Sequence, residues 1–239
     1  MEKTRGFVIK TLKYGDTSAI LKVYTEAYGT KSFIQKGFFN PKKRPLRSLQ
    51  FPFAMAEFSF KLNQKSTLIL PSQISPIHSF TQLFQHPIKM MMMQFLAEVT
   101  GMVLKEEEDN LSLFSYLETQ FKTFNDKLDH FADFHLIFLM QLTQHLGFSP
   151  NTSRFHYPYF DMQEGIFIPD KNATFLLNEQ ETMVWKRLIQ SEFKQDSVNL
   201  FNQIERNALS HMLLNYYKLH IPGFKEPHSL EIIKEVFNS

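Results

Sequence analysis

The feature that most constrains the fold of this 239-residue chain is a change in its hydrophobic pattern near Pro71. Before Pro71, short segments rich in β-branched and aromatic residues alternate with turns that contain glycine. Beyond the Pro71–Pro76 junction, apolar residues recur at the spacing of a helix. The pattern predicts an α+β fold, with a small N-terminal β-barrel followed by an all-helical C-terminal domain that carries a small irregular lobe.

The first part of the chain is expected to be built from short strands without a helix of any length. Gly15 and Gly29 lie in two of the turns and supply the positive φ that tight turns require. Five short strands in about 65 residues favour an OB-fold, although the pattern does not separate it from an SH3-like barrel. The expected strands are Phe7–Lys13, Ala19–Tyr24, Lys31–Gln35, Gln50–Leu62 and Ser66–Leu70.

The helical part is expected to span residues 81–239, after a barrel domain of residues 1–80. Asn110 is a possible helix cap, Gly147 is a good helix stop, and Asn178 with Glu181 resembles a capping box. Prolines and glycine between residues 148 and 177 predict loop and short strand there instead of helix. The expected helices are Ile88–Lys105, Leu111–Phe124, His130–Leu146, Asn178–Phe193, Ser197–Tyr217 and Ser229–Phe237.

The charge of the chain is unevenly distributed. Through Gln82 there are 13 Lys and Arg against 4 Asp and Glu, whereas the remainder has 13 basic and 20 acidic residues. The N-terminal part through Gln82, here called the basic head, is therefore suited to bind a polyanion, whereas the remainder is mildly acidic. Charge alone modestly favours nucleic-acid binding over the alternative, a basic domain that is merely well solvated.

Several classes of function are excluded or disfavoured by what the sequence lacks. The absence of cysteine excludes disulfides, thiolate nucleophiles, iron–sulfur clusters and cysteine-based zinc sites. The sequence contains no phosphate-loop, dinucleotide or hydrolase motif, and its nine histidines are poorly spaced for a metal. We therefore expect neither catalysis nor a metal or other cofactor. Without a signal peptide or a long apolar stretch, we expect a cytoplasmic protein that has no contact with a membrane.

The strongest candidate for a binding site is the basic segment from Lys36 to Arg47, read as a loop between strands. Its cations can neutralise phosphates, and exposed phenylalanines can stack on unpaired bases. The alternative is a solvated loop whose phenylalanines are buried in the barrel. The candidate DNA-binding residues are Lys10, Lys31, Lys36, Phe38, Phe39, Lys42, Lys43, Arg44 and Arg47.

A set of short motifs, spread in order over nearly the whole chain, resembles the RecO family of DNA repair and recombination mediators. Its parts are Gly6-Phe7-Val8-Ile9-Lys10, Tyr14-Gly15-Asp16-Thr17-Ser18, Tyr24-Thr25, Gly29, Lys36-Gly37, Leu146-Gly147-Phe148-Ser149-Pro150, Phe160-Asp161, Glu164-Gly165 and Leu214-Asn215-Tyr216-Tyr217-Lys218-Leu219-His220. The resemblance implies a bacterial, nucleoid-associated protein that binds single- and double-stranded DNA and anneals complementary strands. It also implies two partners: single-stranded DNA-binding protein, through its C-terminal tail, and RecR, with which such proteins help to load RecA.

The chain departs from this family at one point. Many members carry a four-cysteine zinc site just after the segment that matches Leu146–Pro150, but residues 151–158 of this chain contain no cysteine. The lobe at about residues 148–177, in place of that site, is expected to be held by aromatic packing instead. The side chains expected to do so are Phe155, Tyr157, Tyr159, Phe160 and Phe167.

Two other functions remain open. The barrel could be an RNA-binding OB module, which a preference for structured RNA over single-stranded DNA would support. Alternatively, the chain could be a protein-interaction scaffold, which salt-insensitive partner binding without affinity for nucleic acid would support.

Overall fold

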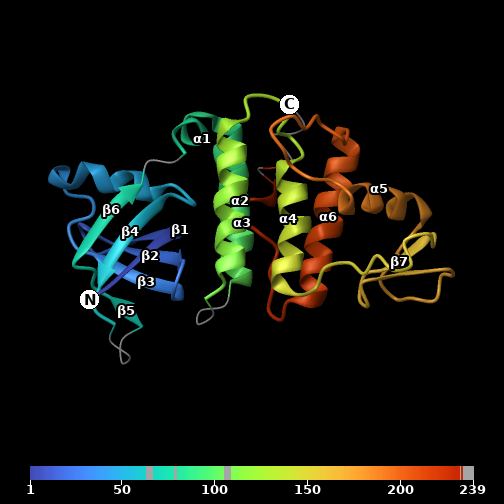
Figure 1. Ribbon diagram of the computed structural model, residues 1–239, viewed down its shortest axis with the longest axis horizontal. Helices are drawn as coiled ribbons and strands as arrows, with labels where there is room; N and C mark the ends of the chain where they lie inside the picture. Colours follow the sequence, from blue (N-terminus) through green and yellow to red (C-terminus); the bar gives the residue numbers. More distant parts are fainter. Residues whose placement is uncertain (63–66, 78–79, 105–108, 232, 234–239) are drawn as a thin grey trace. The chain divides into compact units, whose positions relative to one another are not determined.

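Strands dominate the first third of the chain and helices the rest, which confirms the expected α+β class (Figure 1). The computed structural model describes residues 1–62, 67–77, 80–104, 109–231 and 233, without the side chains of residues 43–45, 81 and 84. It divides into two compact units, Met1–Asn125 and Asp126–Ser239. Among the described residues, the first unit thus includes three α-helices that follow the sheet, whereas a domain boundary at residue 80 remains a prediction from the sequence.

The sheet of the first unit has the strand order β5-β3-β2-β1-β4-β6. Central strand β1 pairs with both β2 and β4, and β3 pairs in parallel with β5, in an OB-like arrangement. Among the described residues, β5 and β6 remain the two edges, so the backbone pairing does not close the barrel. The strands are β1 (Glu2–Tyr14), β2 (Ser18–Thr25), β3 (Gly29–Gln35), β4 (Met55–Phe60), β5 (Leu68–Ile69) and β6 (Gln73–Ile77).

The basic segment is not a plain loop, and the expectation of no helix in this region was wrong. Residues Pro41–Gln50 form a 3₁₀ helix, η1, whose first turn is capped by Asn40 accepting the Lys42 N–H at 3.1 Å. Leu46 and Leu49 lie three residues apart, on one side of such a helix, and both are buried in the core of the sheet. Because η1 takes residues 41–50, the strand expected from Gln50 begins only at Met55.

Strand β6 was not expected, because the prolines and serines of residues 71–76 indicate a junction. Pro76 is tolerated there because β6 is an edge strand: it pairs with β4 on one side, and a missing N–H on the other side disrupts no ladder. The predicted strand Ser66–Leu70 is reduced to β5 among the described residues, and Ser66 lies outside them.

Three helices follow the sheet within the first unit: α1 (Thr81–Gln85), α2 (Pro87–Val103) and α3 (Leu111–Asp126). The last two confirm predicted helices, and Asn110 Oδ1 caps α3 by accepting the Leu113 N–H at 2.9 Å. On β1, the Phe7 ring lies 4.9 Å from that of Phe114 and 5.8 Å from that of Phe121, both on α3. These contacts bury one end of the outer face of the sheet, by which we mean the face that points away from the core of the sheet.

The second unit contains α4 (Phe134–Leu146), α5 (Glu179–Ile189) and α6 (Gln203–His220). The predicted capping box of Asn178 and Glu181 is present at α5, and Asn202 with Glu205 forms a second one at α6. Helix α6 therefore begins at Gln203, six residues later than expected, and α4 begins four residues later than expected. Within the expected helix Ser229–Phe237, the structure describes residues 229–231 and 233: Ser229 lies in a turn, and Leu230, Glu231 and Ile233 are helical.

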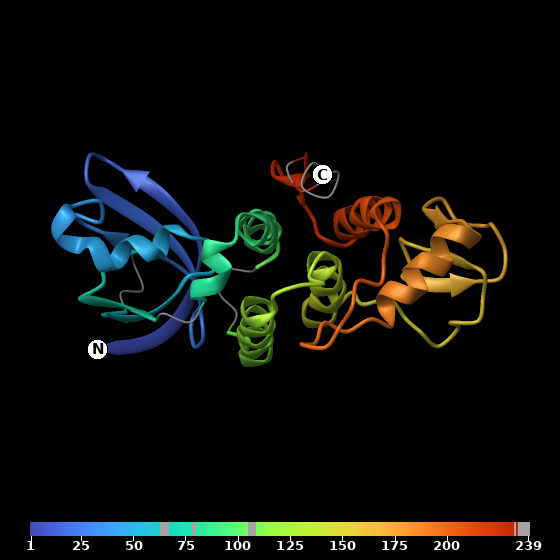
Figure 2. The same cartoon turned by 90° about the horizontal axis from the view of Figure 1, so that it is seen from above.

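The lobe contains a three-stranded sheet of β7 (Tyr159–Asp161), β8 (Ile166–Ile168) and β9 (Leu176–Leu177), in the order β8-β7-β9. Figure 2 shows the lobe in yellow and orange beside α5. Aromatic packing is present as expected: the Phe167 ring lies 5.0 Å from that of Phe155 and 4.9 Å from that of Phe160. Phe160 also packs against Trp185 of α5, at 5.8 Å. In the described part of the chain, no helix has the length and apolar character needed to cross a membrane.

Candidate nucleic-acid interface

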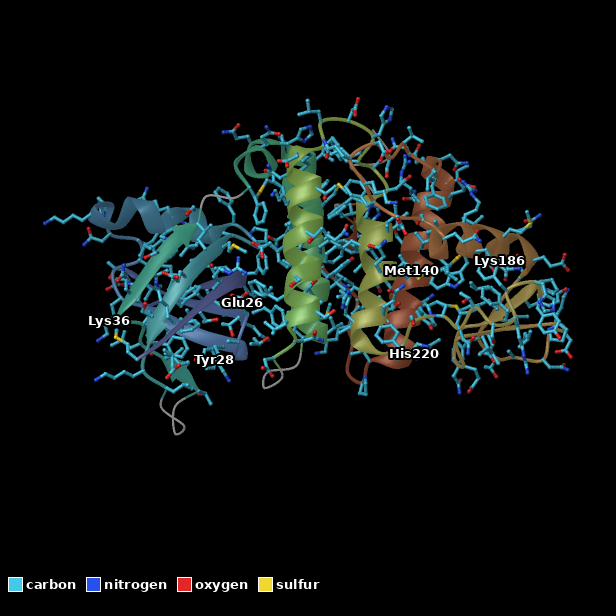
Figure 3. All side chains as sticks on the ribbon, in the orientation of Figure 1. Glu26, Tyr28, Lys36, Met140, Lys186 and His220 are labelled. Atoms are coloured by element: carbon cyan, nitrogen blue, oxygen red, sulfur yellow. The ribbon has the colours of Figure 1, made fainter. Side chains whose placement is uncertain are left out.

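Two turns meet at one end of the sheet of the first unit. One connects β1 to β2, and the other joins β3 to η1. They are linked by the Phe39 N–H, which donates to the Thr17 carbonyl at 2.9 Å. Lys36 is exposed in the second turn, and Figure 3 shows it at the end of the sheet opposite Glu26, which lies towards α2 and α3. Of the candidate cations, Lys36 is thus placed at this end of the sheet, in the turn that leads into η1.

The sheet register decides which face each lysine occupies. Lys10 pairs with Lys22, which pairs with Ser32, so these three share one cross-strand row on the outer face. Lys31 pairs instead with buried Val23, which places it on the core-facing side at the other end of β3. The structure therefore brings Lys10 to the outer face but separates Lys31 from it.

Helix η1 carries four of the candidate cations. Lys42 and Arg47 are exposed near its two ends. A ten-residue 3₁₀ helix rises about 2 Å per residue, so the two backbone positions are roughly 10 Å apart along the axis. The side chains of Lys43 and Arg44 lie outside the described residues. The segment thus presents its charge along a short rod, not from an unstructured loop.

The two candidate aromatic residues differ in their environment. Phe38 is completely buried in the core of the sheet, with an exposed fraction of 0%. No face of its ring is available to a base, so its proposed role in stacking is corrected to one in core packing. Phe39 is half-buried against the same core, with its ring 5.1 Å from that of Phe38. It remains a candidate only through its exposed edge.

Sequence reasoning missed two side chains on the outer face of β1. Leu12 is 46% exposed and Tyr14 is 53% exposed. The signal was available, because Lys10, Leu12 and Tyr14 alternate with a period of two and must therefore share one face of the strand. The strand expected from the sequence ends at Lys13, whereas β1 extends to Tyr14.

The acidic residues of the basic head are largely engaged within the protein. Glu26 accepts from Arg5, Glu57 pairs with Lys3 at 2.9 Å, and Glu2 accepts from the Tyr28 hydroxyl at 2.5 Å. The hydrogen bond from Arg5 lowers the pKa of Glu26. Hydrogen bonding to Glu2 raises the pKa of Tyr28. By contrast, Asp16 is exposed in the turn that connects β1 to β2.

The second unit has a hollow of about 810 Å³ along helix α6. Its floor and walls are mostly apolar and include Met212 of α6 and Leu176 of β9, while Phe175 forms a 45%-exposed lip. His211 and Lys218 supply polar groups from the exposed side of α6. Such a hollow has the chemistry of a site for an apolar peptide segment.

The described residues do not assemble a metal site, because no three His, Asp or Glu side chains among them converge. His156, the histidine inside the lobe, is exposed and contacts Tyr157, with ring centroids 4.2 Å apart and ring planes tilted by 53°. Instead, a lysine ammonium lies among the lobe aromatics: Lys186 Nζ donates to the Tyr157 carbonyl at 2.7 Å.

Comparison with known proteins gives one consistent family. Residues 1–80 match the family model described as "Recombination protein O N terminal", and residues 85–230 match "Recombination protein O C terminal". The chain is similar to the "DNA repair protein RecO" of Flavobacterium psychrophilum, at 36% identity over 99% of both chains. It is also similar to the proteins of the same name from Flavobacterium johnsoniae, at 35% over 99% of both chains, and Bacteroides fragilis, at 32% over the full length of both. The chain therefore belongs to the RecO family of DNA repair proteins.

Proposed function

We propose that this chain is a DNA-binding recombination mediator that works without bond-making chemistry. It binds single- and double-stranded DNA on the nucleoid, promotes annealing of complementary strands and, with RecR, supports RecA loading onto single strands coated by their binding protein. The observation that carries this proposal is the set of exposed cations on β1, on the turn after β3 and on η1, in a chain of the RecO family; they are Lys10, Lys36, Lys42 and Arg47.

The mechanism is electrostatic. Lys10, Lys36, Lys42 and Arg47 hold phosphates and release the counterions that the nucleic acid had condensed. Neutralising part of the backbone charge lowers the repulsion between two strands, while base edges that the protein leaves uncovered stay available for pairing. Lys31, Lys43 and Arg44 belong to the same proposed set, and Phe39 adds a partial apolar contact.

The test is a fluorescence titration of a labelled single-stranded oligonucleotide at several salt concentrations, followed by addition of the complementary strand. Affinity should fall steeply with salt, and annealing should accelerate without metal or nucleotide. Replacing Lys36 and Lys42 by Gln should reduce the slope of log K against log salt by about 0.7 for each lost phosphate contact, or about 1.4 in total.

A matched control uses two exposed lysines of the second unit. Lys171→Gln with Lys225→Gln removes the same charge, and the salt slope should match that of the unmodified protein. Equal effects of the two pairs would show that net charge, and not the positions of Lys36 and Lys42, sets affinity. Preference for a structured RNA competitor over single-stranded DNA would favour the RNA-binding alternative.

The hollow along α6 supports a contact with a partner, which we propose to be the C-terminal tail of single-stranded DNA-binding protein. An apolar tail residue fits the hollow, and Lys218 offers a cation to an acidic group. A labelled tail peptide should bind the protein, and Met212→Gln should weaken it without changing the affinity for DNA. Undiminished peptide binding by this variant would remove the hollow from the proposal.

A further inference from the structure

The outer face of the sheet is only half covered by helices. At one end, Phe7 and Tyr24 are buried against α3, and Ile9 packs against α2. At Gly101 of α2, an added Cβ would lie 3.0 Å from Ile9 Cγ2, so glycine permits this close approach. Lys22 Nζ reaches the Gly101 carbonyl at 3.5 Å and marks the limit of the covered half.

Beyond this limit, the same face stays open and carries apolar side chains in register. Leu12 pairs with Ile20, and Ile20 pairs with Ile34, which gives one continuous row across β1, β2 and β3. Tyr14 lies two residues further along β1, so it projects from the same face. Residues directly opposite on neighbouring strands have Cβ atoms about 5 Å apart, so these side chains form one contiguous surface.

Cations stand on both sides of the apolar row. Lys10 and Lys22 occupy the cross-strand row next to it, and Lys36 follows the end of β3 beyond it. Tyr14 lies four positions beyond Lys10 on β1, which is about 13 Å along a strand. A ligand that crosses this face therefore meets positive charge, then apolar surface with an aromatic ring, then positive charge again.

We propose that this open face is a base-contacting platform, with Tyr14 as its stacking ring, and that it makes the protein prefer single-stranded over duplex DNA. The proposal rests on the proposed function, which it deepens. A single strand offers phosphates for the lysines and unpaired base faces for Tyr14, Leu12 and Ile20. A duplex keeps its base faces stacked inside, so it reaches only the lysines. A protein partner with an apolar surface fits this face less well than DNA does, because it would remove the lysines from water without pairing them.

The test compares Tyr14→Ala with Tyr14→Phe, because the second variant keeps the ring. Binding of a labelled oligothymidylate and of a duplex of equal length is titrated at fixed salt. Tyr14→Ala should weaken single-strand binding on the order of tenfold, the loss that one base–aromatic stack implies, and leave duplex binding unchanged. Tyr14→Phe should bind both as the unmodified protein does. Because Tyr14 is exposed, thermal unfolding should be the same for all three.

The salt slope separates this inference from the proposed function. Tyr14→Ala should keep the slope, since it removes no phosphate contact, whereas the Lys36 and Lys42 variant should change it. An equal loss of affinity for the single strand and the duplex in Tyr14→Ala would overturn the proposed platform. Unchanged single-strand affinity of Tyr14→Ala, alongside weakened binding by the Lys36 and Lys42 variant, would overturn it too. In both cases the proposed function stands. Absence of any DNA binding by the unmodified protein would overturn both.

Discussion

Arg5 and Glu26 form a two-pronged ion pair, in which Nε and Nη2 of Arg5 donate to the two carboxylate oxygens at 3.0 and 2.7 Å. The remaining Nη1 donates to Glu118 of α3 at 2.9 Å. The guanidinium also lies 5.3 Å from the centroid of the Phe114 ring. One side chain thus ties β1 to the residue that follows β2 and to the helix that covers the sheet.

Replacing Arg5 by Met should lower the free energy of unfolding by about 1 kcal/mol at pH 7. The effect is modest because the Arg5 and Glu26 side chains are 37% and 32% exposed, so water screens the pair. Urea denaturation followed by far-ultraviolet circular dichroism measures it. Lys3→Gln is the control, because Lys3 makes one 2.9 Å contact with Glu57 and is 64% exposed; its loss should stay below about 0.5 kcal/mol.

The same pair predicts a pH dependence. Because the hydrogen bond from Arg5 lowers the pKa of Glu26 from 4.5, the folded state holds the charged carboxylate more strongly than the unfolded state does. This contribution is fully present above pH 4.5 and is lost as the pH falls through the lowered pKa. The stability difference between the unmodified protein and Glu26→Gln should therefore shrink on acidification below pH 4.5. A difference that stays constant down to pH 3 would contradict this assignment.

Lys186 is expected to stabilise the lobe. Its Nζ donates to the Tyr157 carbonyl and lies 5.4 and 5.2 Å from the ring centroids of Phe155 and Phe167. Lys186→Met should destabilise the second unit by about 1–3 kcal/mol, because the carbonyl loses its partner and the rings lose the cation. Fluorescence of Trp185, the one tryptophan of the sequence, reports unfolding of this unit.

The control for Lys186 is Lys171→Met. Lys171 is exposed and lies 5.5 Å from the centroid of the Tyr159 ring, so its loss should cost less than about 0.5 kcal/mol. A chelator should leave the unfolding midpoint of the unmodified protein unchanged if packing and the ammonium hold the lobe. A chelator-induced fall in the midpoint would instead indicate a bound metal.

The fold was predictable where local chemistry decides the structure. The turns at Gly15 and Gly29, the cap at Asn178 and the helix end at Gly147 were each expected from residue type, and each is present. Strand β6 and helix η1 were not predictable in this way. A proline such as Pro76 indicates the end of a strand unless its position at the edge of the sheet is known. Helix η1 depends on the burial of Leu46 and Leu49 in a core that distant strands form.

The sequence was sufficient to predict which segments of the candidate site are basic, but not which side chains share one exposed surface. Charge counting identified the basic head, and the composition of residues 36–47 identified its most basic segment. Assigning Tyr14 to the open face required the sheet register, because a shift of one residue exchanges the two faces of a strand. Phe38 lies in the turn after β3, and its burial depends on a core that distant strands form. The bulge between Val8 and Lys10 makes that register difficult to derive from a single sequence.

A buried histidine predicts acid sensitivity of the second unit. His135 has an exposed fraction of 0%, and burial lowers its pKa to about 3. Between pH 6.5 and 3 the unfolded state binds a proton that the folded state excludes, so stability is lost as the pH falls through this window. The loss attributable to His135 should reach about 2 kcal/mol by pH 5.

His135→Gln tests this through the slope of stability against pH, whatever its stability at neutral pH. Urea denaturation followed by Trp185 fluorescence should give a flatter profile between pH 6.5 and 5 than the unmodified protein gives. The control, His156→Gln, removes an exposed histidine and should leave the profile unchanged. Parallel profiles for His135→Gln and the unmodified protein would show that another group causes the acid sensitivity.

The contact between Gly165 and Tyr216 predicts non-additive mutations. Gly165 has a φ of +67°, and an added Cβ would lie 2.8 Å from Tyr216 Oη, which donates to the Phe148 carbonyl at 2.8 Å. Gly165→Ala should cost about 2–3 kcal/mol, of which 1–2 comes from the left-handed backbone and the rest from the clash. Tyr216→Phe should cost about 1 kcal/mol for the lost hydrogen bond. Because the phenylalanine has no oxygen to collide with, the double variant should cost about 1 kcal/mol less than the sum, measured by Trp185 fluorescence in urea. Strict additivity would show that the alanine is accommodated without displacing Tyr216.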